Sequence, residues 1–123
     1  MAAPFIPYIR RPERPPDELS EADRLWKGYR VRPLRGVIEL LRLQRQVRPR
    51  LSRIHQPLLI TQGRLDFTVH SDVPDMIYAG VSSAVKKVQW FERSRHCVII
   101  DDEWEQVADM TLRFMQQVQR GLR

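Results

Sequence analysis

Several features that define common protein classes are scarce or absent in this sequence. It contains one cysteine, Cys97, which excludes an internal disulfide and a metal cluster held by cysteines. No run of roughly 18 apolar residues occurs, so we expect no segment that spans a membrane. A signal peptide is not expected from the N-terminal stretch MAAPFIPYIRRPERPP, because its apolar part is short and its charges follow that part. These absences predict a soluble protein of the cytoplasm.

Charge is unevenly distributed along the 123 residues. Residues 1–53 contain 13 Lys and Arg against 6 Asp and Glu, a net of +7, and residues 54–123 contain 8 against 9, a net of −1, which together give +6. An Arg-rich segment can bind nucleic acid or a membrane surface. No aromatic interleaving or known binding motif accompanies these arginines, so a solvated helix surface is the favoured interpretation. Nucleic-acid binding is the weaker one, and we expect no nucleic-acid partner.

The N-terminal part is predicted to begin without regular structure. Residues 1–20 should be extended and irregular because they carry five prolines, at positions 4, 7, 12, 15 and 16. A short helix is expected over residues 20–28. Ser20 is a suitable N-cap for it, Asp23 occupies the capping-box position, and Gly28 can end it.

A longer helix is predicted from Pro33 to about residue 48, and Pro49 should stop it. Its apolar residues recur at the i, i+3, i+4 and i+7 positions of one helix face. The predicted apolar stripe consists of Leu34, Val37, Ile38 and Leu41.

The C-terminal part alternates short apolar runs with helical signals. The run PLLIT, bounded by Pro57 and Gly63, is typical of a strand buried on both faces. Asp72 can cap a helix over residues 74–81, and KKVQWFE (residues 86–92) predicts a second strand. The packing side chains of that second strand are expected to be Val88, Trp90 and Phe91.

The last segment predicts a helix most clearly. CVIIDD (residues 97–102) fits either a short strand or a loop that leads into this helix. Asp102 and Glu105 have the spacing of a capping box at the start of the helix. Its apolar face is expected to contain Trp104, Val107, Thr111, Phe114 and Val118.

The order strand, helix, strand, loop, helix predicts an α/β fold with a parallel sheet. Two or three strands do not make a stable sheet of this kind, because a parallel sheet needs cover on both faces. We therefore expect that part of the sheet is missing or is supplied by a partner.

Two polar residues follow the two predicted strands at corresponding places. Asp66 comes after the first strand and its turn, and His96 comes after the second strand. Functional side chains of open α/β sheets collect beyond the carboxyl ends of the strands, and neighbouring strands lie only about 4.8 Å apart. A carboxylate that accepts from one nitrogen of a histidine ring fixes its tautomer and stabilises the imidazolium. This placement makes Asp66 and His96 the candidate acid–base pair.

Three stretches carry a resemblance to a known family: PLLITQGRLDFTVH, KKVQWFERSRHCVIIDDEWEQV and TLRFMQQV. They resemble the C-terminal part of α/β-hydrolases of the carboxylesterase and monoacylglycerol-lipase-like, serine aminopeptidase-type group. The resemblance implies that Asp66 is the acid and His96 the base of a Ser…Asp…His triad. In the family a glycine precedes the base, whereas this chain has Arg95 there, which could displace His96 or require a positive φ.

The same resemblance implies a division of the chain into two parts. Residues 1–53 would be a Pro/Arg-rich segment with part of a helical cap, and residues 54–123 would be the C-terminal core portion that carries acid and base. Cap side chains that are candidates for lining a substrate pocket are Trp26, Tyr29, Leu34, Leu41 and Leu43.

No Gly-x-Ser-x-Gly motif occurs in the sequence, so the nucleophile of the family is missing. The resemblance therefore implies the C-terminal part of a serine hydrolase for carboxylic esters, which needs no cofactor or metal and is inactive alone. Its partners would be a small ester substrate and either the missing N-terminal half or a second copy. The alternative is a non-catalytic remnant or interaction module that uses an exposed sheet edge and Arg-rich helices.

Overall fold

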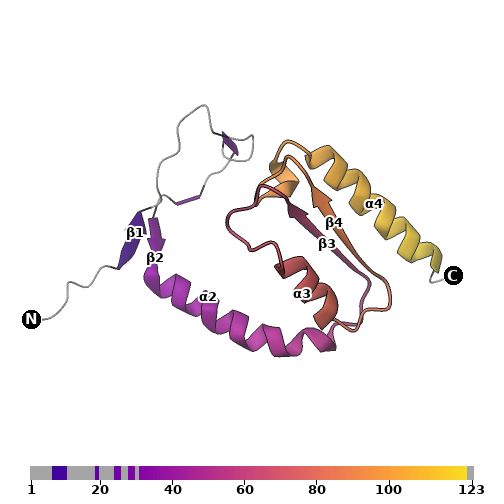
Figure 1. Cartoon of the computed structure of the whole chain (residues 1–123), viewed down its shortest axis with the longest axis horizontal. Coiled ribbons are helices and arrows are strands. Elements are labelled where there is room, and N and C mark those ends of the chain that lie inside the picture. The colour runs from indigo at the N-terminus through magenta and orange to yellow at the C-terminus, as the bar shows by residue number, and fades with distance from the viewer. Residues whose placement is uncertain (1–6, 11–18, 20–23, 26–27, 30, 122–123) are drawn as a thin grey trace, which may run out of the picture.

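The computed structural model describes residues 7–10, 19, 24–25, 28–29 and 31–121. The helix predicted over residues 20–28 and the pocket candidate Trp26 lie largely outside this description. The described elements form two small sheets, one antiparallel and one parallel, together with three α-helices and two 3₁₀ segments (Figure 1).

The antiparallel sheet lies in the N-terminal part. Strand β1 (Tyr8–Arg10) pairs with β2 (Val31–Pro33), so that Ile9 stands opposite Arg32. All six residues of these strands are exposed. The extended backbone predicted for residues 1–20 is thus a short strand where the structure describes it.

Helix α2 (Leu34–Val47) occupies the predicted place and continues into the 3₁₀ segment η2 (Arg48–Arg53). The α-helix ends ahead of Pro49, as expected for a residue that cannot continue the hydrogen-bond ladder. The predicted apolar stripe is present but not buried, and no residue of α2 is buried. Its exposed large apolar side chains are Val37, Ile38, Leu40, Leu41, Leu43 and Val47.

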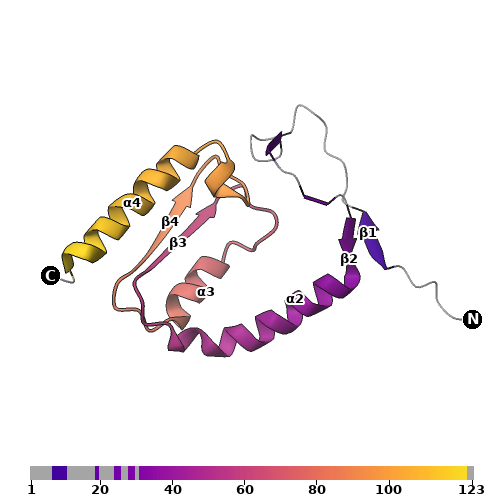
Figure 2. The same ribbon diagram turned by 180° about the vertical axis from the view of Figure 1, so that it is seen from behind.

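The predicted parallel α/β arrangement is confirmed in the C-terminal part. Strand β3 (Leu58–Gly63) pairs in parallel with β4 (Lys86–Phe91), with Ile60 opposite Val88, and helix α3 (Val73–Gly80) connects them. Helices α3 and α4 (Trp104–Gly121) flank the strand pair from different sides in Figures 1 and 2. Both strands therefore end at the same edge of the sheet.

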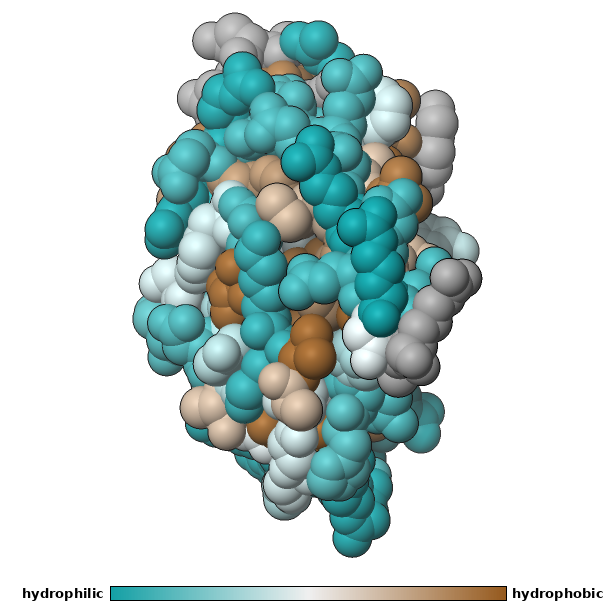
Figure 3. Space-filling model, turned by 90° about the vertical axis from the view of Figure 1, so that its right-hand side faces the viewer, coloured by the Kyte–Doolittle hydropathy of each residue, from teal (hydrophilic) through white to brown (hydrophobic). Residues whose placement is uncertain are grey.

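Burial differs from the prediction for β3. The strand was expected to be buried on both faces, yet only Gln62 and Gly63 are buried, and Leu58 to Thr61 are half-buried. Among the described residues β3 has one paired neighbour and incomplete cover. On the face seen in Figure 3, hydrophobic residues lie between hydrophilic ones.

Two predicted helix caps are wrong in detail. Asp72 is the N-cap residue of α3, but its side chain makes no capping hydrogen bond and instead contacts His70, at 2.7 Å between Oδ1 and Nδ1. The Val107 N–H donates to the Glu103 carbonyl, which makes Glu103 rather than Asp102 the N-cap residue of α4. The side chains of Asp72 and Glu103 each bond to residues of the preceding loop.

The segment before α4 is a turn and not a strand. Residues Val98–Ile100 form the 3₁₀ segment η3, which corresponds to the loop alternative for CVIIDD. Val98 packs with Phe91 from β4 and Val107 from α4 in a small buried cluster. This cluster joins the end of the sheet to the start of the last helix. None of the helices in the described residues is long and apolar enough to cross a membrane.

Candidate active site

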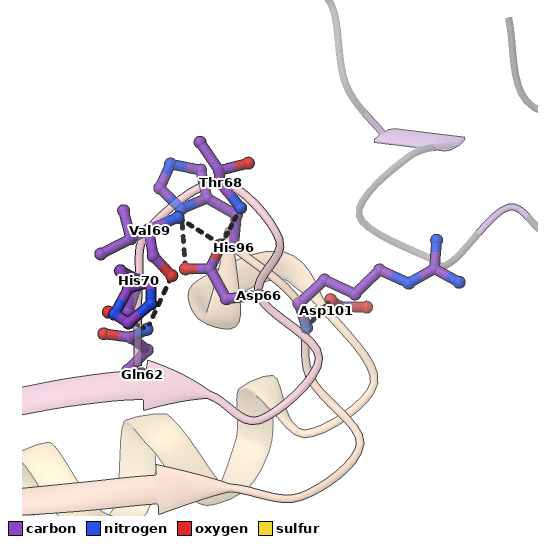
Figure 4. A network of polar contacts seen from close by, with 8 residues as sticks. Gln62, Asp66, Thr68, Val69, His70, His96 and Asp101 are labelled. Atoms are coloured by element: carbon purple, nitrogen blue, oxygen red, sulfur yellow. Dashed lines mark hydrogen bonds and ion pairs between the residues drawn. The ribbon is translucent and has the colours of Figure 1, made fainter. Parts of the chain in front are cut away.

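The candidate site lies at the carboxyl edge of the parallel sheet. Asp66 belongs to the loop of residues 64–72 that follows β3, and His96 belongs to the loop of residues 92–97 that follows β4. The two side chains point toward one another in Figure 4, and His96 Nδ1 lies 3.0 Å from Asp66 Oδ2. The structure thus brings together both predicted residues, which are 30 positions apart in the sequence.

The two partners differ sharply in exposure. The side chain of Asp66 is 3% exposed, whereas that of His96 is 49% exposed. A buried carboxylate against one ring nitrogen favours the tautomer with its proton on Nδ1 and leaves Nε2 free to accept a proton. The pair therefore has the construction of an acid–base histidine with an orienting carboxylate.

The second oxygen of Asp66 organises its own loop. Oδ1 accepts hydrogen bonds from the backbone N–H groups of Thr68 at 2.7 Å and Val69 at 3.0 Å. Burial by itself raises the pKa of Asp66, but the hydrogen bonds from Val69, His96 and Thr68 outweigh it and hold that pKa below its ordinary value. Asp66 is therefore ionised at neutral pH, which is the form that a histidine partner requires.

Gln62, the penultimate residue of β3, holds the far end of the same loop. Its buried side-chain Nε2 donates to the carbonyl of Val69 at 3.3 Å and lies 3.5 Å from that of His70. The loop is closed both by Asp66 and by this strand residue (Figure 4).

Gly63, the last residue of β3, lets the two loops approach each other closely. A Cβ atom at this position would collide with the backbone carbonyl oxygens of Ser94 and Arg95. Beside it, the Leu65 N–H donates to the Ser94 carbonyl at 3.1 Å. The absence of a side chain at Gly63 is what allows the His96 loop to lie against the end of β3.

The loop that carries His96 is held by two carboxylates from the start of the last helix. Glu103 Oε2 accepts from Ser94 Oγ at 2.7 Å and from the Arg93 N–H at 2.8 Å. Asp101 Oδ2 accepts from the Arg95 N–H at 2.7 Å. Every residue between Glu92 and His96 is thereby bonded to one of these acids.

Arg95 causes no backbone distortion, contrary to the expectation for a family glycine position. No non-glycine residue in the described part of the chain has a positive φ. The Arg95 backbone instead donates to Asp101, and its neighbour His96 remains in contact with Asp66. The bulky side chain is tolerated because the turn here does not use the left-handed region.

One protein family matches most of this chain. The family model described as serine aminopeptidase, S33, matches residues 10–103, which is more than half of the chain. The chain belongs to this family of α/β-hydrolases. The predicted resemblance and fold class are therefore confirmed.

Relatives of this α/β-hydrolase chain include two enzymes from Bacillus. It is 24% identical over 111 residues to a carboxylesterase of Bacillus subtilis (strain 168), covering 90% of this chain and 44% of that enzyme. It is 28% identical over 97 residues to a thermostable monoacylglycerol lipase of Bacillus sp. (strain H-257), covering 79% of this chain and 39% of the lipase. The hydrolase chain thus spans less than half the length of either relative.

A solved structure from work on LipS and LipT, two metagenome-derived lipolytic enzymes, is also similar to this α/β-hydrolase chain. The two align with a TM-score of 0.69 and 29% identity over 73% of this chain and 37% of the other.

The remaining predicted site residues of the hydrolase chain stay untested. Tyr29 is 90% exposed, Leu41 is exposed and Leu34 is half-buried, so their role in lining a pocket remains a prediction. Cys97 is half-buried, and His55 and His70 are exposed. The division of the chain at residue 53 also remains a prediction.

Sequence reasoning missed the residues that support the pair. Gln62, Asp101 and Glu103 were given no part in the site. Gln62 was expected in the turn after the first strand, and nothing in the sequence marks it as the residue that holds the loop. Asp101 and Glu103 lie in a run of three acids, and acids ahead of a helix look the same whether they cap it or support a neighbouring loop.

Proposed function

We propose that this chain supplies the acid and the base of an α/β-hydrolase that cleaves carboxylic esters, and that a serine from outside the chain supplies the nucleophile. The observation that carries this proposal is the 3.0 Å contact between buried Asp66 and half-exposed His96 at the carboxyl edge of the sheet. The substrate class follows from the named activities of the relatives, a carboxylesterase and a monoacylglycerol lipase. The expected substrates are short- or medium-chain acyl esters or monoacylglycerols.

In the proposed reaction His96 acts first as a base and then as an acid. Its Nε2 takes the proton from the attacking serine hydroxyl, and the serine oxygen forms a bond to the ester carbonyl carbon. The same proton then passes to the leaving alcohol as the ester bond breaks. Asp66 stabilises the imidazolium that exists between the two transfers. Water attacks the acyl-enzyme in the same manner and releases the acid.

Two of the described serines are already engaged with other groups. Ser94 is completely buried and its hydroxyl donates to Glu103, while the Ser83 hydroxyl lies 3.4 Å from the Ile54 carbonyl. The sequence contains no Gly-x-Ser-x-Gly that could form a nucleophile elbow. We propose that the missing strands and the serine come from the remainder of a hydrolase domain, and that the assembly works in the cytoplasm without a cofactor.

A chimera tests this proposal. This chain replaces the matching segment of the Bacillus subtilis carboxylesterase, which restores a serine half, and hydrolysis of p-nitrophenyl butyrate is measured. We expect activity in the chimera, a loss on the order of 10³-fold or more with His96→Ala or Asp66→Asn, and no change with the control His55→Ala. Unchanged activity with His96→Ala would refute the catalytic role.

The natural chain is assayed beside the chimera. We expect no hydrolysis above buffer from it. If it is active and His96→Ala is not, the acid–base pair is right and the external nucleophile is wrong.

A second candidate function is that of an interaction module without catalysis. Two observations favour it: β3 has a single paired neighbour in the part of the chain that the structure describes, and α2 exposes its apolar stripe. Unpaired strand edges promote association, including with a second copy. Light scattering over a range of concentrations tests this, since a molar mass that stays at the 14.6 kDa of one chain excludes self-association.

A further inference from the structure

The three residues that precede His96 make three hydrogen bonds to two carboxylates, and a fourth hydrogen bond joins them to the other loop. Glu103 binds the Arg93 N–H and the Ser94 hydroxyl, and Asp101 binds the Arg95 N–H. The Ser94 carbonyl meanwhile accepts from Leu65 in the other loop. The backbone that leads to His96 is therefore fixed on both sides.

These groups are deeply buried, which makes their hydrogen bonds important. Ser94 and Asp101 are 0% exposed, and Glu103 is also buried. A buried carboxylate is stable only where donors surround it, and removing it leaves those donors unpaired. Burial raises the pKa of Glu103, but the hydrogen bonds from Ser94 and Arg93 hold it below its ordinary value, so it is an ionised acceptor at neutral pH.

We infer that Glu103 is a positioning residue for His96. Its hydrogen bonds with Ser94 and Arg93 hold the loop after β4 in the position in which the His96 ring contacts Asp66. A role of Glu103 in catalysis rests on the proposed function, but the position of the His96 ring can be measured without an activity assay. Glu103 itself does not touch the ring and is not a catalytic residue.

A purely structural role for Glu103 as the helix cap makes a different prediction. Its backbone carbonyl accepts the hydrogen bond from Val107 in the first turn of α4, whereas its side chain bonds to the preceding loop. Loss of a helix cap would weaken α4 and leave the His96 ring unchanged. Loss of the hydrogen bonds between the Glu103 side chain and the loop would instead change the position of the His96 ring.

The experiment is a long-range ¹H–¹⁵N NMR spectrum of the histidine rings in the full chain, at a pH where the rings are neutral. In the natural chain we expect His96 to carry its proton on Nδ1, held by Asp66, and exposed His55 to show the tautomer mixture of a solvated ring. With Glu103→Ala the His96 signals should shift to the pattern of His55. Glu103→Gln keeps an acceptor oxygen and should restore most of the Nδ1-protonated form.

The matched control is Glu105→Ala, an exposed acid in the first turn of the same helix, which should leave the His96 signals unchanged. An unchanged His96 ring in Glu103→Ala overturns the inference, and so does an equal loss in Glu105→Ala. Should Glu103→Ala fail to fold, Ser94→Ala decides by the same criterion, because it removes a single hydroxyl from the contact.

The result is independent of catalysis. Glu103→Ala can displace the His96 ring even if His96→Ala leaves the chimera fully active, in which case the positioning stands and the proposed function fails.

Discussion

The two loops that bring Asp66 and His96 together are stabilised in opposite ways. The loop after β3 is closed by its own residues, since Asp66 binds Thr68 and Val69 two and three positions later and Gln62 holds the far end. The loop after β4 contributes few bonds of its own and is held by Asp101 and Glu103. The acid is therefore placed by local structure, and the base is placed by the start of the last helix.

This difference indicates where the site is vulnerable. A change in the Asp66 loop acts directly on the carboxylate, whereas a change at Asp101 or Glu103 can move His96 without touching its ring. The two loops approach each other closely at Gly63.

The largest effect is expected from Gly63→Ala, which disturbs both loops together. The new methyl group would collide with the Ser94 and Arg95 carbonyls, and backbone atoms move only at a cost of about 1–3 kcal/mol or more. We expect a clear drop in melting temperature and loss of the His96 contact to Asp66. Gly121→Ala is the matched control, because nothing lies within 4 Å of a Cβ there. Equal stability of the two variants would contradict the close approach.

A smaller effect is expected from Asp66→Asn, which separates charge from loop closure. The amide can still accept from Thr68 and Val69, but the ionised partner of His96 is gone. Because the pKa of Asp66 is lowered on folding, its stabilisation is present above about pH 4, the ordinary range for Asp, and is lost as the pH falls through the lower folded pKa.

Urea unfolding of the natural chain from pH 6 down to pH 2 measures this. The free energy of unfolding should fall in acid, and Asp66→Asn should flatten that fall without removing the part contributed by Glu103. An acid dependence that is identical in both proteins would mean that Asp66 is not perturbed by folding.

The smallest effect is expected from Gln62→Leu, which releases only one end of the Asp66 loop. The substitution keeps a side chain of similar size and loses the bond to the Val69 carbonyl, at a cost of about 1 kcal/mol. His96 should keep its contact, because its own loop is held by the acids before α4. A displaced His96 ring in this variant would show that the two loops are not independent.

The sequence was informative where a single rule governed the residue. Alternation of apolar runs with helical spacing predicted the strand–helix–strand unit, and the parallel topology then placed Asp66 and His96 at one edge. The burial of β3 was predicted too high, because an apolar run reports which side chains suit a core and not whether the chain supplies the cover.

The supporting residues could not be predicted because local rules gave them another role. Asp72 and Asp102 satisfy the pattern of a helix cap. The Asp72 side chain contacts His70 instead, and the N-cap residue of α4 is Glu103. A carboxylate near a helix start has several donors within reach, and tertiary contacts decide among them.

The crossover through α3 has a consequence for inheritance. The hydrogen bonds described above for Asp66, His96 and their supporting residues lie between Gln62 and Glu103, from the end of β3 to the turn after β4. A recombination event that moves this short stretch moves the acid and the base together with their supports.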